Sequence, residues 1–459
     1  MRDIILTLFI FAMLPICFMR PQIGLLMWTW ISYMNPHRLT WSFAYEFRFN
    51  YIVAIATILG IFFAKDIAKK IPITNVTITW LFFVFWICLT TYFALSGKAL
   101  WEWQRTMKIQ AMILVTLLVI RDRKWIEALV WVIALSLGFW GVKGGLFTLL
   151  YGGSYHVYGP DDSFFGDNNT MALAILMAMP LLYYVYLRLD KPIYKIGMLV
   201  VMFLNLVTII GTYSRGGLVG LMVMGLSMVW KTNRRFSILF ILAIVAQLGF
   251  VFMPEKWQER MLGITMFSQE EVVAEDASVS GRINSWLFAL NLVADRPILG
   301  AGFSAFTKAN FDLYAPVKEV HDAHSIYFEV LAEQGIPGFT LFILLFVQAF
   351  LLGRRILRMV RSRPDLVWAK ELASMVQNSL IGYAVAGAFL GMAYFDVPYH
   401  MTSVMVVLYL AVKKAVQTAP PPDVIPSRSK NDPTPFVSIF DPPRKPTPAS
   451  GTTKPLSGR

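Results

Sequence analysis

The chain has 459 residues, of which 57% are hydrophobic and only 15% are charged. Soluble proteins of this size rarely have that balance, and the apolar residues form blocks long enough to cross a bilayer, so the composition indicates an all-α polytopic membrane protein. The net charge of +13 comes from basic residues in short loops between these blocks, which argues against nucleic-acid binding. The two cysteines, Cys17 and Cys88, lie in apolar blocks and favour neither a disulfide framework nor a cysteine metal site.

The apolar blocks predict about 12–13 transmembrane helices. The two counts differ because residues 3–35 form either two short crossings around Arg20 and Pro21 or one broken crossing. In chain order, the predicted spans are 3–19, 21–35, 50–65, 76–96, 106–120, 125–150, 168–188, 194–212, 215–231, 236–253, 324–353, 372–394 and 398–413.

Charge sorts the loops between these spans onto two sides of the membrane. Loops rich in Lys and Arg follow the spans that end near residues 65, 120, 188, 231 and 353, so these loops and the C-terminus should be cytoplasmic. The loops at 36–49, 97–105, 151–167 and 254–323 carry few positive charges and should face outward. From about Thr418 the chain is rich in Pro, Ser, Thr and Lys, a composition that predicts a disordered tail.

A turn between two spans carries the first candidate site residue. Both neighbouring spans have their other ends on the cytoplasmic side, so the turn Gly211–Gly217 should lie on the outer face. Ser214 can cap the helix that follows, which places Arg215 in its first turn, near the positive end of the helix dipole.

The long outer loop predicts two more basic groups at helix starts. Apolar residues recur at helical spacing over 282–294, which predicts an amphipathic helix on the membrane surface, with Ser280 as its cap and Arg282 in its first turn. Asp322 can cap the helix after the loop, so His324 should also lie in a first turn. Together with the arginine of the preceding turn, these groups indicate an anion site on the outer face.

The residue types predict a chemistry for this site. An arginine fork matches phosphate oxygens and stays charged, so Arg215 and Arg282 suit the diphosphate of a lipid-linked substrate. A helix dipole and nearby arginines favour the neutral imidazole of His324, which is the form that a general base needs to deprotonate an acceptor hydroxyl. The leaving diphosphate then needs only charge stabilisation, so the division of roles requires no metal and no cofactor.

Simpler interpretations stand beside this one. Each arginine could serve only to bind lipid headgroups at the membrane boundary. His321 and His324 are three residues apart, but no third ligand stands at a metal-binding spacing, so no metal site is predicted. Asp396, just before Pro398 at an outer helix end, either orients His324 or a substrate, or caps the last span.

Three stretches resemble the O-antigen ligase superfamily. The run from His324-Ser325 through Leu331-Ala332-Glu333-Gln334-Gly335-Ile336-Pro337-Gly338 is similar to its signature, His-Asn/Ser followed by Leu-x-x-x-Gly-x-x-Gly. Two upstream stretches resemble its other motifs, so that the resemblance covers about 168–413. The first 150 residues resemble the N-terminal region of O-glycosylation ligases found beside exosortase systems. The two upstream motifs are matched by Tyr213–Gly217 and by Gly281-Arg282 with Arg296–Gly302. The N-terminal resemblance lies in Pro21–Gly24 and Tyr33–Arg38.

The resemblance implies a metal-independent, inverting glycosyltransferase that moves a glycan from undecaprenyl diphosphate to an acceptor hydroxyl on lipid A core or protein. It implies that Arg215 and Arg282 hold the diphosphate and that His324 activates the acceptor, at the periplasmic face of a bacterial inner membrane. Asp396, Ser325 and His321 would support them, with Ser325 standing where many members have Asn.

The implied organisation has three parts: N-terminal membrane helices over 1–150, a catalytic membrane domain over 151–415 that includes the periplasmic loop 254–323, and a disordered cytoplasmic tail over 416–459. Two alternatives stay open. A polysaccharide polymerase of the same superfamily would share the chemistry, and a transporter of lipid-linked sugars would belong to another class. Nearly charge-free mid-span segments favour surface chemistry over passage. The sugar, the acceptor and the oligomeric state are left open by the sequence.

Overall fold

The computed structural model describes residues 1–64, 70–230, 252–255, 257–258 and 269–418. These residues form α-helices and short 3₁₀ helices and contain no β-strand, which confirms the all-α class. The helices are α1 (Arg2–Met19), α2 (Pro21–Met34), η1 (Pro36–Leu39), α3 (Phe49–Phe63), α4 (Asn75–Tyr92), α5 (Ala99–Val119), α6 (Arg123–Leu150), α7 (Asn168–Arg188), α8 (Pro192–Gly211), α9 (Arg215–Trp230), α12 (Gln269–Asp295), α13 (Lys308–Tyr314), α14 (Ile326–Met359), η2 (Pro364–Leu366), α15 (Val367–Ala386), η3 (Gly387–Phe389) and α16 (Asp396–Thr418).

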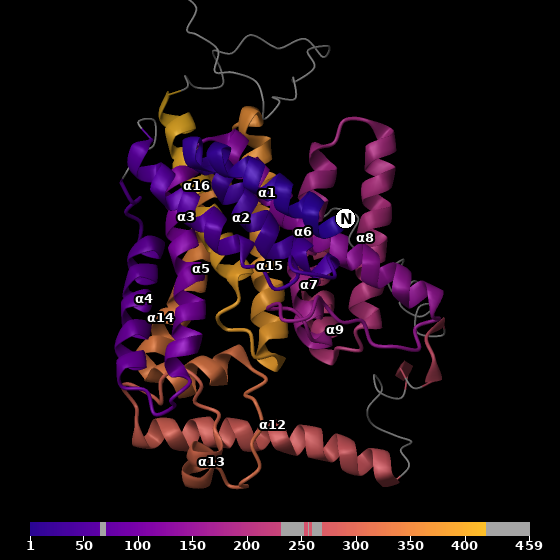
Figure 1. Ribbon diagram of the computed structural model, residues 1–459, viewed down its shortest axis with the longest axis vertical. Coiled ribbons are helices and arrows are strands. Elements are labelled where there is room, and N and C mark those ends of the chain that lie inside the picture. Colours follow the sequence, from indigo (N-terminus) through magenta and orange to yellow (C-terminus); the bar gives the residue numbers. More distant parts are fainter. Residues whose placement is uncertain (65–69, 231–251, 256, 259–268, 419–459) are drawn as a thin grey trace, which may run out of the picture. The chain divides into compact units, whose positions relative to one another are not determined.

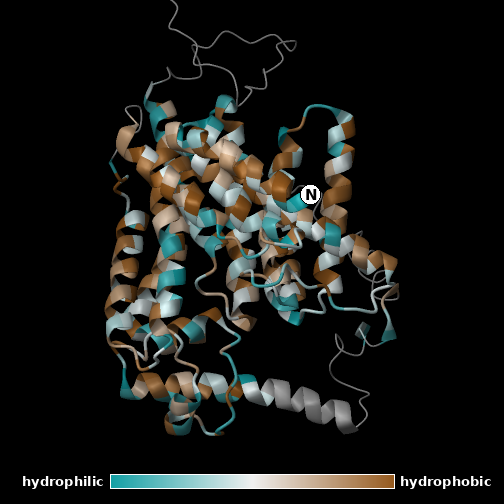
Figure 2. Cartoon of the chain, in the orientation of Figure 1, coloured by the Kyte–Doolittle hydropathy of each residue, from teal (hydrophilic) through white to brown (hydrophobic). Residues whose placement is uncertain are grey.

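Length and composition make this a membrane-embedded protein. Seven helical segments of the described residues are long and apolar enough to cross a bilayer, and α3 and α9 are shorter apolar helices. Figure 2 shows hydrophobic residues along these helices and hydrophilic residues gathered at their ends and in the connecting loops. The predicted span 236–253 lies almost entirely outside the described residues. The predicted disordered tail, 416–459, lies outside them from 419 onward, and its first three residues instead continue α16 to Thr418, because no Pro or Gly stops the helix before that point. The seven segments are α1, α4, α6, α7, α8, α14 and Pro364–Phe389.

Helix α12 is longer than the sequence pattern predicted. It runs from Gln269 to Asp295 and crosses one end of the helix bundle, with α13 beside it (Figure 1). The prediction that Ser280 caps this helix and that Arg282 lies in its first turn is therefore wrong, because both residues are well inside the helix. The physical reason is that residues 269–279 contain three Glu and two Ala, which are good helix formers, and neither Gly nor Pro to stop the helix.

The start of α14 also differs from the prediction. The helix begins at Ile326, with Ser325 at the N-cap position and no side-chain cap, so Asp322 does not cap it and His324 is not in its first turn. His324 has φ +43, a left-handed backbone conformation that cannot continue into a right-handed helix. The helix starts later than predicted because the preceding segment is bound to α12, as described below.

A break inside α14 explains two of the sequence motifs. Gly335 has φ +64 and ψ −173, so the helix kinks there and frees backbone groups of the preceding turn. The loop after α12 pairs with them: Ala301 N donates to the Ala332 carbonyl and Gly302 N to the Glu333 carbonyl, both at 2.9 Å. This pairing satisfies groups that would otherwise be buried without partners. The loop Arg296–Gly302 is thereby fixed to the start of α14.

Candidate functional site

The first part of the site is the start of α9. Ser214 Oγ accepts a hydrogen bond from Gly217 N at 3.2 Å, which confirms the predicted cap and makes Arg215 the first residue of the helix. Asn168 of α7 donates from Nδ2 to the Thr212 carbonyl at 2.9 Å. The turn that carries Arg215 is therefore tied to the N-terminus of α7.

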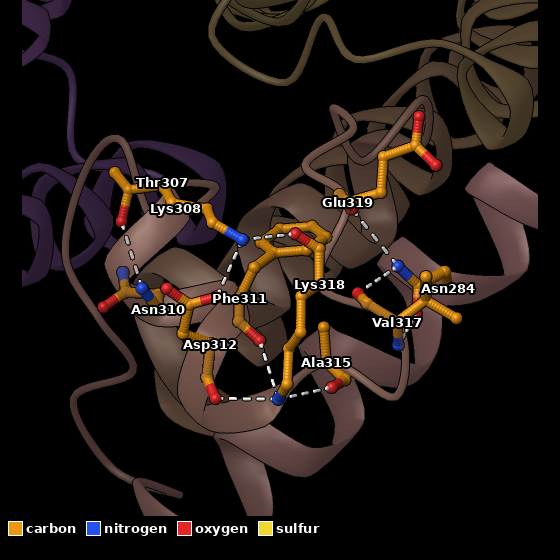
Figure 3. A network of polar contacts seen from close by, with 10 residues as sticks. All are labelled: Asn284, Thr307, Lys308, Asn310, Phe311, Asp312, Ala315, Val317, Lys318 and Glu319. Atoms are coloured by element: carbon orange, nitrogen blue, oxygen red, sulfur yellow. Dashed lines mark hydrogen bonds and ion pairs between the residues drawn. The ribbon is translucent and has the colours of Figure 1, made fainter.

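The second part is a clamp that three consecutive residues of α12 form on the loop before α14. Asn284 Nδ2 donates to the carbonyls of Val317 and Glu319, and its Oδ1 accepts from Val317 N at 2.9 Å (Figure 3). Ser285 Oγ donates to the His321 carbonyl at 3.1 Å, and Trp286 Nε1 donates to the Ala323 carbonyl at 3.0 Å. The clamp consists of Asn284, Ser285 and Trp286, and it holds the loop that contains both histidines.

Neighbouring side chains brace the first half of the same loop. Lys318 Nζ donates to the carbonyls of Asp312 and Ala315 at 2.7 and 3.1 Å, and Lys308 Nζ donates to the Lys318 carbonyl at 2.7 Å (Figure 3). Lys308 also forms an ion pair with Asp312 at 2.8 Å. These lysines serve the loop structure, so they are poor candidates for binding a substrate.

The clamp brings Arg282 close to His324. Arg282 is three and four residues before Ser285 and Trp286, so it lies on the helix face that meets the loop. Burial lowers the pKa of His324, and the positive charge of Arg282 lowers it further, while Asp322 and Asp167 act in the opposite direction. The imidazole is therefore biased toward its neutral form, as predicted, although burial and not a first-turn position is the main cause.

Arg215 and His324 belong to the same end of the bundle. Gly216, next to Arg215, packs against Phe389 of η3, and Gly387 of the same short helix packs against Ile326, two residues after His324. Asp167 gives a second connection. Its charge acts on the pKa of His324, and the next residue, Asn168, donates the hydrogen bond to the turn before Arg215. Segments that are about one hundred residues apart in the sequence thus meet around η3 and the start of α7.

Two residues of this region have a strained backbone. His324 and Tyr213 have φ +43 and +58, and among the described residues the other non-glycine positions with positive φ are Asn35, Asp162 and Ser304, outside this region. Tyr213 donates its hydroxyl proton to the Gly153 carbonyl at 2.5 Å, and its ring lies 4.3 Å from that of His156. Such conformations persist only where surrounding contacts impose them, and they are common at functional sites.

The supporting residues predicted from the sequence are placed differently. Ser325 is buried, and the His321 ring packs against Gly281 of α12 and lies 3.5 Å from the Glu319 carboxylate. Asp396 is the first residue of α16 and lies near Tyr33 and Arg105, which favours a place at the helix start over a partnership with His324.

An acidic residue that the sequence analysis overlooked lies closer to the loop. Glu329 is in the first turn of α14, and its Oε2 accepts from Ala393 N at 3.1 Å. Gly391 separates this carboxylate from the His324 backbone nitrogen. The available signal was an isolated acid in the first turn of an apolar helix, a position that often stabilises the helix start. Among the described residues no group of three or more side chains is arranged to hold a metal ion.

Two known families match parts of the chain. Residues 200–343 match a family model described as O-Antigen ligase, and this interval contains Arg215, Arg282 and His324. Residues 1–189 match a model described as a family of unknown function (DUF5935). No curated protein matches the chain. The predicted likeness to exosortase-associated ligases stays a prediction, because neither description refers to it.

Proposed function

The chain belongs to the O-antigen ligase superfamily, and from that membership we propose that it transfers a glycan from a polyprenyl diphosphate to an acceptor hydroxyl. The observation that carries the proposal is the clamp on the loop before α14. It sets a histidine biased toward the neutral form beside a permanently charged arginine. A base and a phosphate-binding group are the two functions that this transfer requires.

In the proposed reaction, His324 accepts the proton of the acceptor hydroxyl as its oxygen attacks the first carbon of the donor sugar. The bond between that carbon and the diphosphate oxygen breaks, and the diphosphate leaves with the electron pair. Attack opposite to the leaving group inverts the configuration at the carbon. Arg282, and Arg215 at the start of α9, would stabilise the negative charge that develops on the leaving oxygen.

We place this reaction at the periplasmic face of a bacterial inner membrane, with the C-terminus in the cytoplasm, because the loops near α12 are poor in Lys and Arg. The catalytic part would be 151–415, including the loop 254–323, and the helices of 1–150 would support it. Undecaprenyl diphosphate is the donor carrier we propose, with lipid A core or a protein as acceptor.

The test uses the purified full chain in lipid nanodiscs, with a lipid-linked glycan as donor and either lipid A core or a pilin-like protein as acceptor, in the presence of a chelator. We expect one acceptor to gain the mass of the glycan. His324→Ala should lower the rate by about 10²–10⁴-fold, the usual contribution of a general base. Arg215→Ala should also lower it, while Arg354→Ala, which changes an exposed arginine of α14, should not.

Two outcomes would contradict the proposal. Full activity of a well-folded His324→Ala protein would contradict the role of His324 as general base. Loss of activity in chelator would contradict a metal-independent mechanism. Growth of the donor glycan without any added acceptor would identify a polymerase.

A further inference from the structure

A large cavity lies in the N-terminal half of the protein. Its volume is about 1090 Å³, and its walls come from α2, η1, α3, α5 and the loop before α7, with one residue from the start of α16. Apart from that residue, Asp396, the whole lining lies within the interval that matches the family of unknown function. None of Arg215, Arg282 and His324 lines it. The proposed transfer therefore leaves the cavity unexplained.

Helices α3 and α5 run in the same direction along this cavity. In their first halves, Lys108 Nζ of α5 lies 4.7 Å from the ring centre of Tyr51 of α3. Beyond their ends, Arg121 Nη2 donates a hydrogen bond to the Lys70 carbonyl at 2.6 Å. Lining residues near the starts of the two helices therefore lie at one end of the cavity, and lining residues further along lie at the other.

The cavity is charged at the first of these ends and apolar at the second. Beyond Tyr51 and Lys108, every lining residue of α3 and α5 is apolar. From Arg48 to Ile58 the helix rises about 15 Å at about 1.5 Å per residue, which is half of the roughly 30 Å hydrocarbon core of a bilayer. These dimensions suit an amphiphile with one polar headgroup and a chain that spans a single leaflet. The apolar lining residues are Ala54, Ile55, Ile58, Ile109, Ala111 and Met112.

The apolar end continues onto the outer surface of α3. Ile55 lines the cavity and is exposed, and Leu59 and Phe62, four and seven residues further on, are exposed on the same helix face. In a membrane-embedded protein, an exposed apolar stripe of this kind contacts the lipid chains. A lipid chain can therefore reach the cavity sideways from the bilayer.

Arg38 at the charged end has only weak acidic partners. Its side chain is 12% exposed and forms ion pairs with Glu46 and Asp162 at 3.5 and 3.4 Å, but these two acids are 79% and 74% exposed. Ion pairs with exposed groups contribute little free energy, so an anionic ligand can replace either acid. Asp396, the third acid of the lining, is buried and presents little surface to a ligand.

Two further cations stand on either side of the Tyr51 ring. Arg48 is the N-cap residue of α3, three positions before Tyr51, and Lys108 reaches the same ring from α5. Neither forms an ion pair with a residue that the structure describes. Arg105 adds a cation whose acidic neighbour, Glu102, is 4.0 Å away and outside the lining. The charged end is therefore complementary to an anion.

The start of α3 adds to this preference. Its first turn contains no acidic residue, and no side chain caps it. The positive end of the helix dipole is thus not offset by the protein, and a negative group beside Arg48 would offset it.

We propose that this cavity binds a phospholipid with an anionic headgroup. The phosphate lies between Arg48 and Lys108, and one acyl chain follows Ile55, Ile58 and Met112 along α3 and α5. The occupant is a lipid of the surrounding membrane and not the glycan donor, because none of the three candidate site residues lines the cavity. The segment of unknown function is accordingly a lipid-binding part of the protein. This proposal does not depend on the proposed transfer.

The test is lipid binding by the purified, delipidated full chain in detergent, measured by native mass spectrometry and by thermal unfolding. We expect phosphatidylglycerol to bind about tenfold more tightly than phosphatidylethanolamine, which has no net charge, and to raise the unfolding temperature more. The double variant Arg48→Gln/Lys108→Gln changes two exposed side chains and should weaken phosphatidylglycerol binding about tenfold or more. Lys98→Gln/Arg354→Gln removes two exposed cations outside the lining and should not weaken it.

Two competitors separate the possible sources of the anion. Glycerol 3-phosphate, added at constant ionic strength, represents a free phosphate, and undecaprenyl phosphate represents the donor lipid. Displacement of phosphatidylglycerol by either one at equal concentration would overturn the proposal, as would equal affinities for the two phospholipids.

The variants supply a second check. Unchanged phosphatidylglycerol binding by Arg48→Gln/Lys108→Gln would also overturn the proposal, and equal unfolding temperatures of this variant and the original protein without lipid would show that a loss of binding is not a loss of fold. His324→Ala should bind phosphatidylglycerol as the original protein does, so a failure of transfer and a failure of this site are measured separately.

Discussion

The indole nitrogen of Trp286 donates a hydrogen bond to the carbonyl oxygen of Ala323 at 3.0 Å. The same ring stacks on Phe328 of α14, with 5.0 Å between ring centres and 12° between planes. Trp286 therefore joins α12, the loop before α14 and α14 itself. Because Ala323 is bonded directly to His324, this contact sets where the histidine backbone lies. One helix thus carries both an arginine of the candidate site and the group that positions its histidine.

Trp286→Phe should remove the hydrogen bond and preserve the stacked ring. The lost bond is worth about 0.5–1.5 kcal/mol, so the protein should remain folded. Because the loop loses its anchor beside His324, we expect transfer to fall through kcat more than through KM. Thermal unfolding and steady-state kinetics measure the two effects. Trp103→Phe is the control, since it removes an indole that donates to Cys88 Sγ and takes no part in the clamp. Equal activity of the two variants would contradict the positioning role.

Arg282→Gln should raise the pKa of His324. The folded-state pKa lies below the ordinary 6.5 because of burial first and Arg282 second, so removing the charge cancels only part of the shift. Neutral imidazole predominates above the pKa, so in the variant the acid limb of the activity profile should move to higher pH. Titration of the histidine ring signals by NMR measures the pKa without requiring transfer. Arg354→Gln, which changes an exposed arginine of α14 that does not act on the pKa of His324, should leave it unchanged, and a downward shift in Arg282→Gln would contradict the prediction.

Gly335→Ala should destabilise the break in α14. Gly335 has φ +64, and an added Cβ would collide with the Ile298 carbonyl, a backbone atom that cannot move aside easily. A forced conformation of this kind costs about 1–3 kcal/mol. We expect a lower thermal unfolding temperature in detergent together with weaker transfer. Gly197→Ala provides the matched control, because a Cβ at this helical glycine of α8 meets open space. That variant should be as stable as the original protein or slightly more so.

Ser214→Ala should remove the cap of α9. The cap contributes about 1 kcal/mol, and its loss frees the first turn that carries Arg215. If Arg215 holds the donor diphosphate, KM for the donor should rise while KM for the acceptor stays the same. Steady-state kinetics with each substrate varied in turn measure the two KM values separately. Ser154→Ala, at an exposed loop position, should change neither constant, and an effect of Ser214→Ala on the acceptor alone would contradict the assignment of Arg215.

Local sequence patterns determined much of the framework. Apolar blocks and loop charges were enough to predict an all-α membrane protein. The cap at Ser214 and the helix start at Arg215 were also predictable, since a cap is a contact between residues only three apart. The roles predicted for Arg215, Arg282 and His324 stay predictions, although the structure places the three residues at one end of the bundle.

Only the tertiary structure determined where His324 lies relative to the start of α14. Asp322 looked like a helix cap, but Trp286 holds the preceding backbone, and the helix starts at Ile326 instead. That contact joins residues 37 positions apart. The place of Glu329 depends on a still more distant contact, with Ala393, 64 positions away. A sequence displays short-range preferences one residue at a time, whereas these features arise when several helices pack together, and the energy of that packing overrides the local preference.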